Sequence, residues 1–267
     1  MSGSGSATAI RLANVSKSFV PGGAPAISRF SLDVAPGEFV SILGPSGCGK
    51  STLLRLVDGL LAADAGDVSI GGRPPRPGRH IGFVFQSFRL IPWATALDNV
   101  AFPLEIAGID RSEREATARS WLERVGLGRF ADVYPAALSG GMKQRVALAR
   151  AFAGNPEIML LDEPFASLDA QTREIMQLEL LRLWDERKLT ALFVTHSVEE
   201  AILLADRVVV MGPAPTSLRE IVPVTLPRPR RDAVRSTPEF MALRTYLTGL
   251  IREMITSDPN SPFFNRV

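Results

Sequence analysis

A glycine-rich segment between an apolar run and a helical pattern constrains this chain more than any other feature. Residues 44–52 read Gly-Pro-Ser-Gly-Cys-Gly-Lys-Ser-Thr and match the pattern G-x-x-x-x-G-K-[ST] in full. The preceding run Phe-Val-Ser-Ile-Leu at 39–43 predicts a buried strand, and residues 53–57 continue with helical spacing. In this order a loop presents backbone N–H groups and a helix N-terminus to an anion. The segment therefore predicts a nucleoside triphosphate site.

Two side chains of this loop suit a triphosphate and its metal ion. Lys50 is long enough to reach the β- and γ-phosphates, and the Ser51 hydroxyl can bind Mg²⁺. For Cys48 we expect the backbone N–H to matter more than the thiol, although alkylation of the sulfur would block the triphosphate by its bulk. The candidate nucleotide-binding residues of the loop are Gly44, Pro45, Ser46, Gly47, Cys48, Gly49, Lys50, Ser51 and Thr52.

Size and composition favour a folded protein without a membrane span. The chain has 267 residues, of which 46% are hydrophobic, which is ample for a packed core. The net charge of +2 gives no strong indication of a nucleic-acid partner, and the single cysteine cannot form an internal disulfide. The apolar runs are shorter than the roughly 18 residues of a membrane helix. Residues 1–9 lack the features of a secretory signal and are expected to be flexible.

Strand-like apolar runs alternate with helical patterns along most of the chain, which predicts an α/β fold with a mostly parallel sheet. Strand signals are scarce from about 96 to 153, and we expect an inserted α-helical subdomain at about 88–153. After residue 212 prolines mark a looser segment, and a last helix is expected at about 238–255. The runs that predict the buried strands of the sheet lie at 39–43, 81–85, 158–161, 190–194 and 207–211.

Two adjacent carboxylates, Asp162 and Glu163, follow the apolar run at 158–161. Ligands of open α/β sheets bind at the carboxyl ends of the strands, where such a pair would lie. Asp162 suits Mg²⁺, held through water, and Glu163 suits the orientation or deprotonation of an attacking water. Taken alone, the pair would more often belong to a solvated turn. The phosphate loop upstream favours the catalytic interpretation.

A second helix start with small residues lies in the helical region. Ser139, Gly140 and Gly141 offer a capping hydroxyl, unhindered N–H groups and a helix dipole to an anion. On this segment alone, a plain serine-capped helix is the favoured interpretation. With the phosphate loop, the chain has two candidate phosphate-binding helix starts. Either it binds two ligands, or two chains share one.

The order of these motifs resembles that of ATP-binding cassette (ABC) ATPases over residues 10–211. The resemblance is carried by the phosphate loop, Gln86, Leu-Ser-Gly-Gly at 138–141, Leu-Asp-Glu-Pro at 161–164, Ser-Leu-Asp at 167–169 and His196. The set is far more specific than any single motif. It implies a P-loop NTPase (RecA-like) fold with an N-terminal antiparallel β subdomain. The ATPase domain would span 10–212, with helical residues 88–153 inserted, and 213–267 would form a C-terminal extension.

The same resemblance implies roles for four further residues. Gln86 would contact Mg²⁺ and the attacking water, and His196 would contact the γ-phosphate and support Glu163. Phe19 would stack on adenine, and Asp169 would line a dimer interface. Without the resemblance, Gln86 would be an ordinary polar residue at a strand end, Phe19 a core residue and His196 a helix cap.

The resemblance also implies partners. In this family two copies pair head to tail with two ATP molecules between them, so the phosphate loop of one copy would face Ser139 and Gly141 of the other. Residues 85–100 are similar to the ATPases of nitrate, sulfonate and taurine importers. That similarity implies an ATPase that powers uptake of a small anion through a separate permease, served by a periplasmic or lipid-anchored solute-binding protein. The subunit would lie peripherally on the cytoplasmic face of the inner membrane.

Three further points bear on this assignment. Met142 stands where many family members have Gln, and we expect activity to survive because Ser139 and the backbone donors remain. One rival is a soluble ABC ATPase of DNA repair or translation, but no coiled-coil insertion, tandem cassette or basic stripe supports it. Another rival is an ATP-gated scaffold without hydrolysis, which the presence of Glu163 and His196 disfavours.

An apolar cluster and a group of arginines each allow two interpretations. Phe88, Leu90, Ile91 and Trp93 would form an apolar notch for a permease helix, or Trp93 would instead anchor the helical subdomain. The basic residues after 227 are expected to be solvated linker charges or, as the alternative, contacts to anionic lipid. These basic residues are Arg228, Arg230, Arg231 and Arg235.

Overall fold

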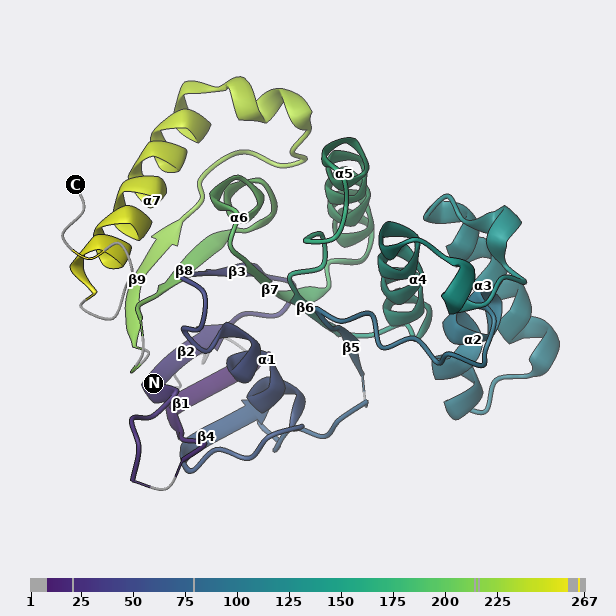
Figure 1. The fold of residues 1–267 in the computed structure, drawn as a ribbon, viewed down its shortest axis with the longest axis horizontal. Coiled ribbons are helices and arrows are strands. Elements are labelled where there is room, and N and C mark those ends of the chain that lie inside the picture. Colours follow the sequence, from purple (N-terminus) through teal and green to yellow (C-terminus); the bar gives the residue numbers. More distant parts are fainter. Residues whose placement is uncertain are drawn as a thin grey trace, which may run out of the picture. The chain divides into compact units, whose positions relative to one another are not determined.

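The structure, a computed structural model, describes residues 9–20, 22–78, 80–213, 215, 217–258 and 264. The expected flexible N-terminus at 1–9 therefore lies outside the described residues, apart from residue 9. The chain divides into two compact units. Unit 1 combines Met1–Pro77 with Leu181–Val267, and unit 2 is Gly78–Leu180. Figure 1 labels the helices and strands of both units.

Unit 1 contains an antiparallel sheet of three strands in the order β2-β1-β4. From Phe30 onward, buried and exposed positions alternate along β2, so one face of this strand packs into the core. This sheet confirms the antiparallel β part of the expected fold. Its strands are β1 (Ile10–Lys17), β2 (Ile27–Val34) and β4 (Ala65–Ile70).

Unit 1 also contains three parallel strands, with β3 between β7 and β8. Every position of β3 (Phe39–Leu43) and β7 (Thr190–Thr195) is buried, which is typical of strands covered on both faces. β8 (Arg207–Met211) pairs in the antiparallel direction with β9 (Leu218–Pro223), which forms the sheet edge. The prediction of a looser segment after residue 212 was wrong for β9. Pro223 ends an edge strand, where a missing N–H is tolerated.

The helices of unit 1 connect and cover these strands. α1 (Lys50–Asp58) follows β3, and α6 (Val198–Leu204) follows β7. A short 3₁₀ helix, η3 (Asp232–Ser236), leads into α7 (Pro238–Ser257), the yellow helix of Figure 1. Both η3 and α7 contact α6. The C-terminal part of the chain is therefore packed onto the helix that follows β7.

Unit 2 combines a pair of parallel strands with helices. β5 (Ile81–Val84) pairs with β6 (Ile158–Asp162), and the chain between them is helical, as expected. Trp121 of α3 stacks on Phe152 of α4 at 5.4 Å between ring centroids and forms part of the helical core. The helical elements are α2 (Ala96–Ile106), α3 (Arg111–Arg124), η1 (Gly128–Phe130), η2 (Pro135–Ala137), α4 (Gly140–Ala153) and α5 (Ala170–Arg187), the last of which continues into unit 1.

The expectation of solvated or lipid-contacting charges after residue 227 was wrong for Arg228 and Arg230. The Arg230 side chain is only 4% exposed, and its guanidinium donates to main-chain carbonyls. Arg228 donates to the Asp206 carboxylate at 2.8 Å and lies over the Trp184 ring at 4.0 Å. Both guanidinium groups thus act inside the fold. A buried arginine needs many acceptors, and sequence alone does not reveal them.

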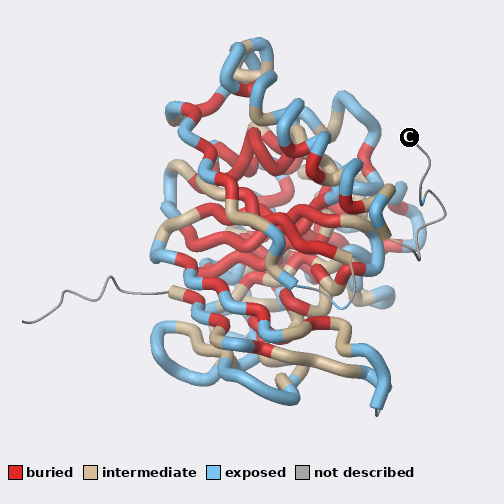
Figure 2. Tube along the Cα trace, turned by 90° about the vertical axis from the view of Figure 1, so that its left-hand side faces the viewer, coloured by how far each residue is buried: buried red, intermediate tan, exposed pale blue. Residues whose placement is uncertain are grey.

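Buried residues are red in Figure 2. They occupy every position of β3, β6 and β7, whereas β4 has no buried position. Among the described residues, none of the helices combines the length and hydropathy that a bilayer crossing requires.

Candidate functional site

The phosphate loop of unit 1 has the geometry that its sequence predicts. β3 ends at Leu43, and α1 begins at Lys50 after an N-cap, Gly49, with φ of 89°. Gly47 also has a positive φ, of 80°. Glycine adopts this left-handed conformation at little cost. Since Gly49 has no side chain to cap the helix, nothing from the N-cap competes with an anion at this helix start.

Gly44 occupies a position with no room for a side chain. A Cβ atom there would lie 2.6 Å from the Met211 carbonyl oxygen and 2.9 Å from the Cys48 Sγ. The first of these is backbone of β8 and cannot turn away. The loop therefore leaves β3 in close contact with the end of the neighbouring strand, which accounts for the glycine at the first position of the motif.

Lys50 places a positive charge inside the loop. Its Nζ donates to the carbonyl oxygens of Gly44 at 2.9 Å and Pro45 at 2.8 Å, and the residue is 6% exposed. These bonds close the loop around the ammonium group. The Lys50 ammonium and the start of α1 therefore lie together in a loop of the kind that can bind an anion.

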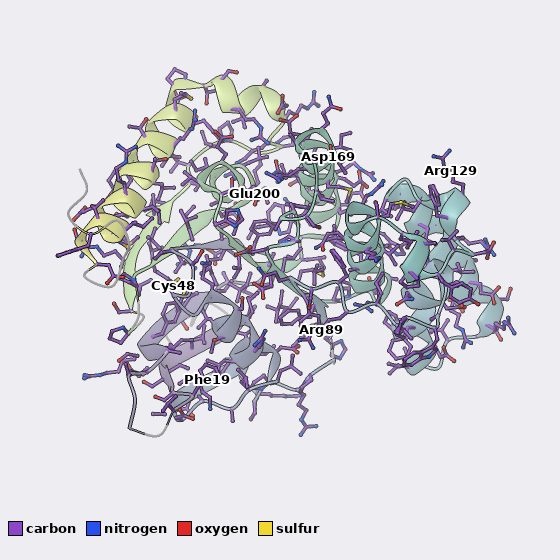
Figure 3. The ribbon with its side chains drawn as sticks, viewed as in Figure 1. Phe19, Cys48, Arg89, Arg129, Asp169 and Glu200 are labelled. Carbon is purple, nitrogen blue, oxygen red and sulfur yellow. The ribbon has the colours of Figure 1, made fainter. Side chains whose placement is uncertain are left out.

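Cys48, labelled in Figure 3, is buried. Its Sγ lies 3.8 Å from the Lys50 Nζ. Burial raises the pKa of the Cys48 thiol, and the nearby Lys50 charge opposes this only in part. We therefore expect the thiol to react slowly in the folded chain. The prediction that alkylation blocks ATP stays a prediction and requires that the loop open first.

His196 follows the strand next to the phosphate loop. β3 and β7 are parallel, and Leu43 pairs with Thr195, so the residues after both strands leave the same sheet edge. His196 is exposed, between Thr195 and the N-cap of α6, Ser197. The structure thus brings His196 and the loop to one edge of unit 1, where ligands of α/β sheets bind.

Gln86 and Glu163 meet at the corresponding edge in unit 2. β5 and β6 are parallel with Val84 opposite Leu161, and the Gln86 Nε2 donates to the Glu163 Oε2 at 3.4 Å. Asp162, the last residue of β6, is 2% exposed. Glu163 has φ of 47°, a conformation that is uncommon without glycine. Strained backbone of this kind often marks a functional turn.

Ser139 caps α4, as predicted from its position before two glycines. Its Oγ accepts a hydrogen bond from the Met142 N–H at 3.3 Å. Ser139 and Gly140 are exposed, and a Cβ on Gly140 would meet only the Phe88 ring, at 3.8 Å. This helix start is therefore open at the surface of unit 2.

Asp169 and Phe19, both labelled in Figure 3, lie at the surface. Asp169 accepts from the Thr172 N–H at 2.9 Å near the start of α5, and this bond is the main reason that its pKa is lowered. Phe19 follows β1 and is 59% exposed, so it is not a core residue. Their roles at an interface and on adenine stay predictions.

Trp93 does not anchor the helical subdomain, because 81% of it is exposed. The loop that carries it is held by Asn99 of α2, which is buried. The Asn99 Oδ1 accepts from the Ile91 N–H at 2.8 Å, and its Nδ2 donates to three carbonyls of the loop. The loop is therefore fixed, and its tryptophan projects from it.

Three polar side chains that the sequence did not predict form hydrogen bonds to the chain beside Gln86, His196 and Trp93. Arg150 of α4 donates to the carbonyls of Phe88 and Arg89, just after Gln86. Glu200 of α6, labelled in Figure 3, accepts from the Thr195 hydroxyl beside His196. Asn99 is the third. Only Glu200 has a sequence signal, the Ser-x-x-Glu spacing of a capping box, which starts at Ser197.

A family model described as "ABC transporter" matches residues 27–166. The chain belongs to the ABC transporter family and is an ABC-type ATPase, an ATP-binding subunit with the P-loop fold expected from its sequence.

Several relatives are similar over most of their length. An ABC transporter ATP-binding protein of Methanocaldococcus jannaschii, itself uncharacterized, is 46% identical over 249 residues, 92% of each chain. The taurine import ATP-binding protein TauB of Escherichia coli O157:H7 is 41% identical over 238 residues, 87% of this chain and 93% of TauB. A protein of Brucella abortus, provisionally named as ATP-binding, is 50% identical over 224 residues, 84% of this chain and 86% of its own.

Among solved structures, the ATP-binding cassette MJ0796 is similar in fold. Its dimeric structure in a post-hydrolysis state with ADP and Pi matches with a TM-score of 0.76 and 36% identity. The match covers 81% of this chain and 99% of that one.

Proposed function

We propose that this chain is the ATP-hydrolysing subunit of an importer, with a separate membrane permease as its partner. The observation that carries the hydrolytic part is the contact of the Gln86 amide with the Glu163 carboxylate at the ends of β5 and β6. The 41% identity to a taurine import protein supports the direction of transport.

In this proposal the phosphate loop binds the triphosphate. The Lys50 ammonium, now bonded to the Gly44 and Pro45 carbonyls, would turn toward β- and γ-phosphate oxygens. Loop N–H groups and the start of α1 supply further donors. The fit is supported by Gly44, whose missing side chain lets the loop pass close to β8.

Mg²⁺ fits the oxygen donors of these residues. We propose that the Ser51 hydroxyl and the Gln86 amide oxygen hold the ion, with Asp162 acting through water. Hard cations of this kind prefer such ligands. When bound, the ion neutralises charge on the phosphates.

Glu163 is the proposed base. Its carboxylate would accept a proton from the attacking water, Gln86 would orient that water, and His196 would contact the γ-phosphate and support Glu163. We expect Glu163→Gln to lower steady-state ATP turnover by about 100-fold or more while ATP still binds. Glu157→Gln, which removes an exposed carboxylate before β6, is the matched control. Full turnover by Glu163→Gln would refute this assignment.

Two copies of the chain would complete the site. We propose that Ser139, Gly140 and Gly141 of one copy bind the γ-phosphate held by the other, with Asp169 at the interface and Phe19 on adenine. The dimeric structure of MJ0796 supports the pairing. Turnover per chain should therefore rise with protein concentration. A specific activity independent of both concentration and Ser139 would contradict the proposal.

The permease would contact the loop that carries Trp93. Its 81% exposure and its support by Asn99 favour a docking role. Trp93→Ala should keep basal ATP turnover and reduce uptake, whereas Tyr134→Ala, also exposed, serves as the control. Unchanged uptake by Trp93→Ala would remove this docking site.

The solute is proposed to be a small anion such as nitrate, an aliphatic sulfonate or taurine, delivered by a solute-binding protein. The subunit would lie on the cytoplasmic face of the inner membrane and bind no nucleic acid. The division into an ATPase domain at 10–212, an inserted helical part at 88–153 and an extension at 213–267 belongs to the same proposal. Uptake of labelled taurine, sulfonate and nitrate by cells with and without the chain would test the solute class.

A further inference from the structure

His196 has its backbone fixed by two elements, β7 before it and α6 after it. Thr195 is the last residue of β7, and Ser197 is the N-cap of α6. The His196 side chain itself is exposed. Any displacement of α6, a helix of only seven residues, therefore moves His196 as well.

Hydrogen bonds connect the first turn of α6 to Thr195, the last residue of β7. The Thr195 Oγ1 donates to the Glu200 Oε2 at 2.5 Å and accepts from the Ser197 N–H at 3.0 Å. The Ser197 Oγ in turn accepts from the Glu200 N–H at 3.3 Å. Glu200 is 7% exposed, so this arrangement lies beneath the surface. Together these bonds link Thr195 and Ser197, the chain neighbours of His196, to each other and to Glu200.

The last turn of α6 is hydrogen-bonded by Arg230, which lies in the segment after β9. Arg230 is buried, and its NH1 donates to Ile202, Leu203 and Ala205, whose carbonyls stand at the end of α6. Its other donors reach the carbonyls of Val224 and Leu226. A cation suits the negative end of a helix. Burial lowers the pKa of Arg230 to about 10, so the guanidinium stays charged at neutral pH.

Further contacts hold the outer side of α6. The Glu199 carboxylate lies 3.0 Å from Arg244 of α7 and 3.7 Å from Arg235 of η3. The side chains of these pairs are 20% to 47% exposed, and such pairs contribute little individually. They nevertheless come from the same C-terminal segment as Arg230. The helix that follows His196 is thus held at both ends and along one side.

We propose that Glu200 and Arg230 are positioning residues for His196. The segment that carries Arg230, Arg235 and Arg244 would then influence the rate of hydrolysis through α6. The inference rests on the proposed role of His196. Glu200 orients the histidine through Thr195 and the first turn of α6. Arg230 acts through the last turn of α6.

The first test compares Glu200→Ala with Glu200→Gln. Alanine removes the acceptor for the Thr195 hydroxyl, and glutamine keeps one in nearly the same place. We expect Glu200→Ala to lower kcat for ATP about tenfold or more, because a small misplacement of a catalytic group is costly. KM should stay within about twofold, since the phosphate loop is untouched, and Glu200→Gln should restore most of kcat.

The second test combines each change with His196→Ala. If Glu200 acts through His196, the double variant His196→Ala/Glu200→Ala should turn over ATP no more slowly than His196→Ala alone. A purely structural role would give multiplied losses instead. That result, or wild-type kcat in Glu200→Ala, would overturn the inference for Glu200.

Arg230 is tested by Arg230→Met, with Arg231→Met as the matched control on its exposed neighbour. The expected result is a kcat about tenfold lower at unchanged KM for Arg230→Met only, again without effect in a His196→Ala background. If Arg230→Met does not fold, Glu199→Gln/Arg244→Gln offers a milder loosening of α6 with the same kcat readout. Full kcat in every α6 variant would overturn the proposal. Full activity of His196→Ala itself would instead refute the proposed function of that histidine.

Discussion

The starts of α1 and α4 both join small residues to a helix N-terminus, but they are built differently. At α1 the N-cap is Gly49, which adds no side-chain hydrogen bond, and the buried Lys50 ammonium is held inside the loop. At α4 the N-cap is Ser139, whose hydroxyl is already bonded to the Met142 N–H, and the helix start is exposed. The first is a closed site with its own charge, whereas the second is an open one with its own cap. The difference supports the proposal that α1 holds a phosphate alone and that α4 adds to a phosphate held by another copy of the chain.

The sharpest test of this contrast removes the charge at α1. Lys50→Ala should weaken ATP binding by about 100-fold or more, since two charge-assisted hydrogen bonds to phosphate are lost. Equilibrium titration with a fluorescent ATP analogue measures the change. Lys188→Ala removes a surface ammonium paired with Asp185 and should bind as the wild type does. Equal affinity of Lys50→Ala and wild type for the ATP analogue would refute the proposal that the Lys50 charge at the start of α1 binds phosphate.

The second test compares glycines. Gly44→Ala should destabilise the chain by about 3 kcal/mol, because its Cβ would lie 2.6 Å from a backbone oxygen that cannot move aside. Gly140→Ala should be nearly neutral, since its nearest neighbour is the Phe88 ring at 3.8 Å. Urea unfolding of both variants gives the two values. Similar losses would show that the α4 start is as tightly built as the loop.

The third test concerns the far end of α1. Burial raises the pKa of Asp58 from 3.8 to about 6, so the folded chain binds this proton more tightly than the unfolded chain does. Stability should therefore fall as the pH rises from about 4 to about 6, and the penalty should persist at neutral pH. Asp58→Asn should remove this contribution to the pH dependence and add up to about 3 kcal/mol at pH 7. If the unfolding curves of wild type and Asp58→Asn coincided at every pH from 4 to 7, the predicted effect of Asp58 on stability would be wrong.

The smallest effect is expected at the α4 cap. Ser139→Ala should cost about 1 kcal/mol of stability, because the Met142 N–H loses its acceptor. ATP affinity of the monomer should stay within about twofold of wild type. A large loss of affinity in a dilute, monomeric sample would place Ser139 at the phosphate of its own chain.

Much of the fold and the site followed from local pattern. The strand before the phosphate loop, the β3–loop–α1 order and the serine cap of α4 depend on residues adjacent in sequence, so their signals lie together. The carboxylates of Asp162 and Glu163 at the end of β6 were also predicted from adjacent residues. β9 was missed because prolines at its margins resemble a loop signal, and only pairing with β8 stabilises it.

The sequence by itself determined that this chain binds a triphosphate, because the loop needs only glycines, a lysine and a helix start in the right order. Tertiary structure decided what surrounds that loop. Arg230 looked like a solvated charge, yet carbonyls from residues about 25 positions away along the chain make it a buried cation at the end of α6. The tertiary structure likewise left Trp93 exposed. Burial and hydrogen-bond satisfaction depend on distant partners, which no local pattern specifies.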